Sequence, residues 1–233
     1  MLYASGLTKY YGDNCALQAL DLEVAAGQIY CLLGANGAGK TTTINLFLGF
    51  IQPSKGELYV DGVSPVLESV TARTRLAYIA EQVSLYPVLT GRENLDYFTR
   101  LSGRALNRTE SDELFQCARL NLSDADRRVS EYSKGMRQKV GIAIALAKNA
   151  KALLLDEPLS GLDPHAASEF CSQLKILSDK GIAILMATHD IFRARELGGR
   201  IGIMKHGRLV DERDASNITA VQLEQAYLAH MRS

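Results

Sequence analysis

The order of hydrophobic and polar residues predicts strands at the start of the chain. Residues 2–10 and 16–24 alternate between apolar and polar positions, as half-buried strands do. Residues 29–33 (Ile-Tyr-Cys-Leu-Leu) form an unbroken apolar run, which suits a strand that is buried on both faces. A glycine-rich loop comes next, followed by a helical stretch over 41–50 and a strand over 57–60. The chain therefore begins with β-strands around one helix.

The pattern changes at about residue 83. From there to residue 149, two stretches (92–101 and 110–120) have helical spacing and few β-branched side chains, which predicts a helical insertion. Strands and helices then alternate: strands at 152–155 and 182–187, helices at 164–178 and 193–197, a hairpin at 202–205 and 208–212, and a helical tail from Ala215. Apolar strands interleaved with helices are typical of an α/β domain with a mainly parallel sheet.

Composition and charge narrow the class of protein. The chain has 233 residues, of which 47% are hydrophobic and 22% are charged, and these values suit one ordinary globular domain. Basic and acidic residues number 26 each, so no net charge favours nucleic acid or anionic lipid. We see no signal peptide and no run that approaches the ~20 apolar residues of a membrane helix. If the protein serves a membrane, we expect it to act through a partner.

The glycine-rich loop matches a phosphate-binding pattern in full. Residues 34–41 (Gly-Ala-Asn-Gly-Ala-Gly-Lys-Thr) have the form G-x-x-x-x-G-K-[ST] and lie between a predicted buried strand and a predicted helix. Glycines let backbone N–H groups turn toward phosphate oxygens, and the helix adds its positive end. Lys40 is expected to reach the β- and γ-phosphates, and Thr41 to bind Mg²⁺. The predicted nucleotide-binding residues here are Gly34, Asn36, Gly37, Gly39, Lys40, Thr41 and Thr42.

That loop indicates a nucleoside triphosphate but does not separate a kinase, a GTPase, a helicase and a transporter motor. Two carboxylates, Asp156 and Glu157, follow the apolar strand at 152–155. Ligands of open α/β sheets bind at the carboxyl ends of strands. Asp156 is therefore expected to hold Mg²⁺, and Glu157 to orient and deprotonate an attacking water. Two adjacent acids favour hydrolysis over transfer to a bound hydroxyl.

A third segment decides the class. Residues 132–139 (Tyr-Ser-Lys-Gly-Met-Arg-Gln-Lys) resemble the signature motif of ATP-binding cassette (ABC) ATPases, usually written L-S-G-G-Q. Ser133 precedes Asp156 by 23 residues, which is the arrangement of that family. Four more motifs keep the family's order: Tyr11 before Gly12 resembles the adenine-stacking aromatic, Gln82 the Q-loop glutamine, Leu159 to Asp163 the D-loop, and His189 the switch histidine. Tyr10 lies beside Tyr11, so core packing of Tyr11 is the alternative.

The resemblance covers residues 2 to about 213 and implies a fold. That fold is an α/β domain with a RecA-like phosphate-loop core and mainly parallel sheet, an N-terminal antiparallel β subdomain and a helical insertion. Within one ABC ATPase domain over 1–233, it implies a core with its β subdomain at 1–82 and 150–213, a helical subdomain with the signature motif at 83–149, and a helical tail at 214–233.

The resemblance also implies an ATPase that works as a head-to-tail pair. A helix that begins at Ser133 directs its anion-binding end away from its own phosphate loop, so it needs a phosphate on a second molecule. In the family's dimer, ATP lies between Lys40 of one protomer and Ser133 with Gly135 of the other. The implied catalytic residues are Glu157, His189, Lys40 and Gln82, and those implied for Mg²⁺ are Thr41, Gln82 and Asp156.

The signature segment departs from the usual motif, with Tyr132 for Leu, Lys134 for the first Gly and Met136 for Gln. Lys134 either points to solvent or adds charge near the γ-phosphate, and the sequence leaves both open. This form, together with residues 85–95, resembles the stand-alone ATPases of bacterial drug, antibiotic and sodium exporters. That branch implies an integral-membrane permease as partner, most simply a homodimer of cassettes, and a place on the cytoplasmic face of the cell (inner) membrane.

The runner-up is a soluble ABC-type ATPase that acts on DNA or ribosomes. Repair-type members carry long coiled-coil insertions and translation-type members fuse two cassettes, whereas this chain has neither feature and only one phosphate loop. A net charge of zero argues in the same direction, so we expect no nucleic-acid partner.

Overall fold

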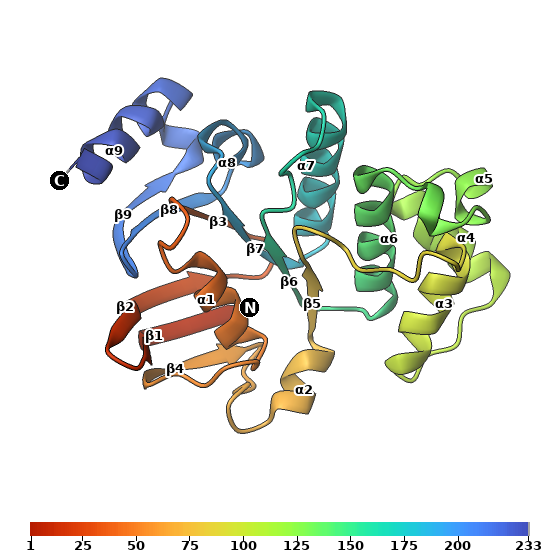
Figure 1. The fold of residues 1–233 in the computed structure, drawn as a ribbon, viewed down its shortest axis with the longest axis horizontal. Helices are drawn as coiled ribbons and strands as arrows, with labels where there is room; N and C mark the ends of the chain where they lie inside the picture. The colour runs from red at the N-terminus through yellow and green to blue at the C-terminus, as the bar shows by residue number, and fades with distance from the viewer. Residues whose placement is uncertain (233) are drawn as a thin grey trace.

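A computed structural model describes residues 1–232, arranged around two β-sheets (Figure 1). The larger sheet has six strands in the order β5-β6-β7-β3-β8-β9, and within the described residues β9 is its one antiparallel member. The predicted mainly parallel sheet is thus confirmed. Its strands are β3 (Ile29–Leu33), β5 (Leu76–Ile79), β6 (Ala152–Asp156), β7 (Ala183–Thr188), β8 (Arg200–Lys205) and β9 (Arg208–Asp214).

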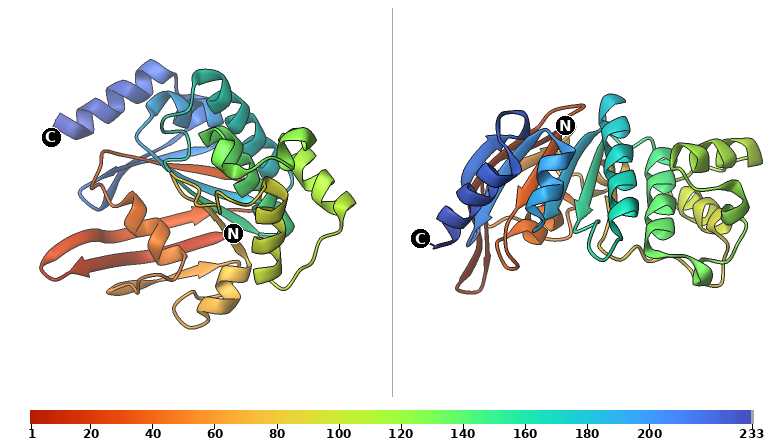
Figure 2. Two further views of the ribbon diagram at one scale, coloured as in Figure 1. Left: turned by 45° about the vertical axis from the view of Figure 1, so that its right-hand side comes forward. Right: turned by 90° about the horizontal axis from the view of Figure 1, so that it is seen from above.

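The smaller sheet is antiparallel, as predicted for the start of the chain. It has three strands in the order β2-β1-β4, namely β1 (Leu2–Tyr11), β2 (Asn14–Val24) and β4 (Lys55–Val60). Its inward-facing side chains, such as Leu7 and Leu20, pack in one cluster with Leu32 of the larger sheet. Helix α1 (Lys40–Phe47) contributes Ile44 to the same cluster and lies between the two sheets (Figures 1 and 2).

Helices cover the opposite face of the larger sheet. Along β3, Tyr30 and Leu32 belong to the cluster that faces the small sheet, whereas Cys31 and Leu33 belong to a second cluster built mainly with helices. This is why the β3 sequence is apolar at every position: both of its faces are buried. The helices on this side are α6 (Lys134–Ala147), α7 (Pro164–Asp179), α8 (Ile191–Leu197) and α9 (Ala220–Arg232).

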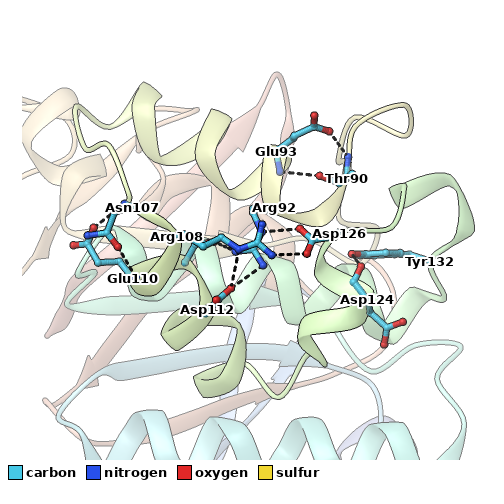
Figure 3. Close-up of polar contacts among 11 residues, drawn as sticks. Thr90, Arg92, Glu93, Asn107, Arg108, Glu110, Asp112, Asp124, Asp126 and Tyr132 are labelled. Atoms are coloured by element: carbon cyan, nitrogen blue, oxygen red, sulfur yellow. Dashed lines mark hydrogen bonds and ion pairs between the residues drawn. The ribbon is translucent and has the colours of Figure 1, made fainter.

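Helices α3 to α6 lie at one end of the molecule, on the far side of α7 from α9 (Figures 1 and 2). Besides α6 they are α3 (Gly91–Leu101), α4 (Arg108–Cys117) and α5 (Leu122–Ala125), with a short 3-10 turn at Val129–Glu131. Capping boxes begin α3 and α4, formed by Thr90 with Glu93 and by Asn107 with Glu110 (Figure 3).

Polar contacts join these helices (Figure 3). Arg92 of α3 makes ion pairs of 2.7 Å with Asp112 of α4 and 2.8 Å with Asp126 after α5. The Tyr132 hydroxyl donates a 2.5 Å hydrogen bond to the Asp124 carbonyl of α5. The same hydroxyl lies against Gly91, where an added Cβ would approach it to 2.3 Å. The segment before the signature helix is therefore held against the start of α3.

Some boundaries differ from the pattern-based expectations. The helix expected over 41–50 ends at Phe47, because Gly49 has a left-handed φ of +66°. The helix expected over 110–120 ends at Cys117, close to Arg119 with φ of +55°. Short elements such as α2 (Ser69–Thr74) and β5 had no expected counterpart.

The predicted C-terminal tail contains a 3-10 turn at Ala215–Asn217 and then α9. Ser233, the last residue of that predicted tail, lies outside the described residues. Among the helices described, none combines the length and apolar character that crossing a membrane requires.

Candidate active site

The phosphate loop and the acidic pair meet at one cavity of about 630 Å³. The loop connects β3 to α1, and the acidic pair ends β6, so both lie at the carboxyl edge of the parallel strands. The predicted residues that line the cavity are Tyr11, Asn36, Gly37, Gly39, Lys40, Thr41, Thr42, Asp156 and Glu157. Sequence positions far apart along the chain thus converge as expected.

Glycines shape the loop at two kinds of position. Gly37 and Gly39 have φ of +81° and +104°, which side chains disfavour. Gly34 has an ordinary φ, but a Cβ there would lie 2.6 Å from the Met204 carbonyl oxygen. The backbone therefore turns tightly into the first residue of α1, and the N-terminal end of this helix faces the cavity wall where an anion would bind.

Lys40 is buried within its own loop, with 5% of its surface exposed. Its ammonium donates to the Gly34 carbonyl at 2.6 Å and to the Ala35 carbonyl at 3.2 Å. It also lies 3.4 Å from a carboxylate oxygen of Glu157. The cation therefore stands between the phosphate loop and the carboxylate that was predicted to act as base.

Thr41 and Asp156 lie together on the same wall. The Thr41 hydroxyl donates to Asp156 Oδ1 at 3.3 Å. Burial raises the pKa of Asp156, and the neighbouring Glu157 charge acts in the same direction, while the Thr41 hydrogen bond lowers it. Oxygen donors of this kind suit Mg²⁺, and a bound cation would offset the cost of burying the carboxylate. These two residues fit the predicted metal site.

Glu157 is held by contacts on both sides. One oxygen, Oε2, lies 2.9 Å from His189 Nδ1, and the other faces Lys40. Its side chain is 15% exposed, whereas that of His189 is 59% exposed. The backbone of Glu157 has a left-handed φ of +46°, and its N–H donates to the Ala187 carbonyl at 2.9 Å. This conformation turns the carboxylate out of the strand and toward the cavity.

The structure separates the two tyrosines at the end of β1. Tyr11 lines the cavity and has 47% of its surface exposed, so it does not pack in the core. Lys9 lies with its ammonium 5.1 Å from the centre of the Tyr11 ring. An exposed aromatic face at the rim of a phosphate-binding cavity is suited to stack on a base.

Five predicted residues do not line this cavity in the single chain, although two of them, Gly34 and His189, adjoin it through contacts with Lys40 and Glu157. Gln82 is exposed and lines a separate cavity of about 430 Å³ together with Lys134 and Arg137. Ser133 is exposed at the N-terminus of α6, where its hydroxyl accepts a 3.2 Å hydrogen bond from the Met136 N–H. Gly135 follows it in the first turn of α6. The signature residues thus lie apart from the phosphate loop of their own chain.

The cavity also has walls that the sequence did not reveal. Asn14, Cys15 and Ala16 border it from the start of β2, and Glu81 and His206 from two loops. The β8–β9 turn carries His206 and contacts the phosphate loop, because the Gly207 N–H donates to the Ala38 carbonyl at 3.0 Å. No motif marks these residues. Glu81 alone adjoins a predicted site residue, because it directly precedes Gln82 in the sequence.

The chain is similar in sequence to proteins of a known family. A family model described as "ABC transporter" matches residues 17–160. The daunorubicin resistance ATP-binding protein DrrA3 of Streptomyces coeruleorubidus is 36% identical over 218 residues, which cover 92% of this chain and 68% of the relative. The Nod factor export ATP-binding protein I of Rhizobium etli is 35% identical over 210 residues, which cover 89% of this chain and 66% of that protein.

This chain therefore spans about two thirds of the length of both relatives. The ATP-binding cassette MJ0796 was solved as a dimer in a post-hydrolysis state with ADP and Pi. It has 27% sequence identity and a TM-score of 0.81 with this structure, over 94% of this chain and 100% of that one. The predicted α/β class with its RecA-like core is confirmed, and the chain belongs to the ABC transporter family as an ATP-binding, ATP-hydrolysing cassette.

Proposed function

We propose that this cassette powers export of a substrate through a separate membrane permease, by closing on ATP with a second cassette and reopening after hydrolysis. The observation that carries the proposal is the position of Glu157, between Lys40 and His189 at the mouth of the phosphate loop. A carboxylate in this place can accept a proton from water next to a bound γ-phosphate.

Within one site, each residue has a separate role. Glu157 orients and deprotonates the attacking water, while Lys40 and His189 stabilise negative charge on the γ-phosphate. Thr41 and Asp156 hold Mg²⁺, which neutralises charge on the phosphate oxygens. Tyr11 stacks on the adenine. Gln82 responds to Mg²⁺ and the γ-phosphate, which requires its loop to move toward the nucleotide from its place beside α6.

The site is completed by a second protomer. Ser133 and Gly135 present the positive end of α6 away from the phosphate loop of their own chain. In a head-to-tail pair, this end reaches the γ-phosphate held by Lys40 of the other copy. ATP then favours the closed pair and ADP the open one, so hydrolysis does conformational work.

The helical part, about residues 83–149, couples this motion to the permease. Its cavity of about 430 Å³ lies beside Gln82 and is suited to receive a short cytoplasmic segment of a membrane protein. Both curated relatives described above are named for drug resistance or export, which supports export as the direction. We place the cassette on the cytoplasmic face of the cell membrane, held there by the permease, and we propose no nucleic-acid partner.

Substitution Glu157→Gln tests the proposal. The amide keeps the size of the side chain but cannot accept the proton of water, so steady-state hydrolysis should fall by about 10²-fold or more. ATP binding should persist, and ATP-bound dimers should accumulate in size-exclusion chromatography. Undiminished hydrolysis would remove Glu157 from its role as the base, and an absence of ATP-dependent dimers would contradict the shared site.

A further inference from the structure

Lys134, the first residue of α6, contacts the loop that follows Glu157. Its ammonium donates a hydrogen bond to the Ser160 carbonyl. This settles where the unusual lysine of the signature segment points in the single chain: it neither extends into solvent nor faces the phosphate loop of its own chain. It bridges the signature helix and the turn beside the catalytic strand.

A second contact joins the same two segments. Gln138, one turn further along α6 and fully buried, donates from Nε2 to the Pro158 carbonyl. The turn itself is closed by a 3.2 Å hydrogen bond from the Ser160 N–H to the Glu157 carbonyl. Two side chains of helix α6 therefore hold the short turn that begins with Glu157, through hydrogen bonds to the carbonyls of Pro158 and Ser160.

The charge of Lys134 makes this contact more than packing. A cation in the first turn of a helix lies near the positive end of the helix dipole, which disfavours it. The Ser160 carbonyl offers a partial negative charge to the ammonium and so offsets this repulsion. The contact with the turn therefore stabilises the ammonium of Lys134 at this position.

We propose that Lys134 is a positioning residue that connects the two ATP sites of the dimer. This rests on the proposed function, because it requires that Ser133 and Gly135 of one copy complete the site of the other. When α6 engages the γ-phosphate held by the partner, Lys134 fixes the turn that carries Glu157 of its own chain. Occupancy of one site then sets the position of the base in the other.

The test compares the ATP dependence of hydrolysis in four purified proteins: the wild type, Lys134→Met, Lys134→Arg and Lys139→Met. Methionine keeps the length of the side chain and removes the donor, whereas arginine retains a cationic donor. Lys139 is the matched control, since it lies on the same helix and pairs with Glu169 of α7 at 2.9 Å, without contact to the turn.

We expect a Hill coefficient above 1 in the wild type, reduced toward 1 in Lys134→Met and retained in Lys134→Arg and Lys139→Met. In the nucleotide-free protein, the amides of Ser160 and Leu162 should exchange hydrogen about three- to tenfold faster in Lys134→Met than in the wild type. A purely structural contact would change the exchange rates but not the Hill coefficient.

Three results would overturn the inference: a wild-type Hill coefficient of 1, an unchanged coefficient in Lys134→Met, or unchanged exchange at both amides. A raised KM for ATP with unchanged cooperativity would instead make Lys134 a phosphate ligand. Failure here is separable from failure of the proposed function. If the wild type hydrolyses ATP and Glu157→Gln accumulates dimers, that function stands whatever Lys134 does.

Discussion

Asp156 shows how a single side chain can be placed for function at a cost to the fold. Its carboxylate lies at the end of a buried strand, and burial raises its pKa. The ionised form is therefore less favourable in the folded protein than in the unfolded chain. A bound cation would reverse that penalty, so the residue is suited to ligation rather than to stability.

Substitution Asp156→Asn should consequently stabilise the nucleotide-free protein, raising its Tm by about 2–4 °C at neutral pH. Because the native pKa is raised, the free-energy penalty is absent below the unfolded-state pKa of about 4, develops as the pH rises from there toward the native pKa, and is complete above it. The gain in Tm should therefore vanish at acidic pH. The same variant should lose the added stability that MgATP gives the wild type.

Thermal unfolding at several pH values, with and without MgATP, measures both effects. Thr42→Ala, a change on the same wall that alters no charge, serves as the control for the pH dependence. A lower Tm for Asp156→Asn at neutral pH without nucleotide would contradict the account.

Individual residues differ in how far the sequence could predict them. The sequence predicted the phosphate loop, Asp156 and Glu157, because each of these motifs directly follows an apolar strand that the same sequence pattern reveals. Tyr11 was distinguished from Tyr10 only by its place before Gly12, and the structure puts it at the cavity. His206 could not be predicted, since it borders the cavity only through the packing of the β8–β9 turn against the phosphate loop.

At the scale of elements, periodicity located most helices and strands but not what joins them. The spacing of 92–101 predicted α3, and the Ser133 N-cap predicted the start of α6. The four-residue strand β5 was missed because it is too short for its alternation to be distinct. The contacts of Arg92 were equally unreadable, because its partners come from two other segments of the chain.

Arg92 joins three helices. Its side chain is 14% exposed and pairs with Asp112 and Asp126 (Figure 3). It also donates to the Ser111 hydroxyl at 2.8 Å. The guanidinium also lies 5.5 Å from the centre of the Phe115 ring. The hydrogen bond from Arg92 is the largest cause that holds the pKa of Asp126 below its usual value.

Arg92→Met should lower the free energy of unfolding by about 1–3 kcal/mol, because the partly buried carboxylate of Asp112 loses its ion pair with α3. Arg100→Met is the matched control: its pair with Asp96 on the same helix is exposed at both side chains, so it should cost much less than Arg92→Met. Urea unfolding at neutral pH measures both. Equal values for the two variants would show that the Arg92 contacts contribute no more than a surface pair.

At the scale of the whole molecule, the signature end of α6 lies apart from the phosphate loop of its own chain. The nucleotide cavity is lined by residues of the core, and Ser133 and Gly135 are not among them. The fold class followed from the alternation of strands and helices, whereas the proposed completion of each site by a second copy involves residues of another molecule. That relation came from the family resemblance and not from any pattern within this sequence.

The rate of hydrolysis per molecule should therefore fall when the protein is diluted at saturating ATP. At low concentration it should rise in proportion to protein concentration, and it should reach a plateau once dimers dominate. Steady-state assays over a wide dilution series, with an inert carrier protein to prevent loss on surfaces, measure this. A rate per molecule that stays constant down to concentrations where light scattering detects only monomers would contradict the shared site.

The contact between Tyr132 and Gly91 has a consequence for anyone who redesigns this cassette. With tyrosine at 132, its hydroxyl occupies the space that any side chain at 91 would need. Replacing that tyrosine with the more usual leucine removes the hydroxyl, which is the nearest of the atoms that an added Cβ at position 91 would meet. The residues at 91 and 132 must therefore be chosen together. A signature segment with tyrosine at 132 requires glycine at the start of α3.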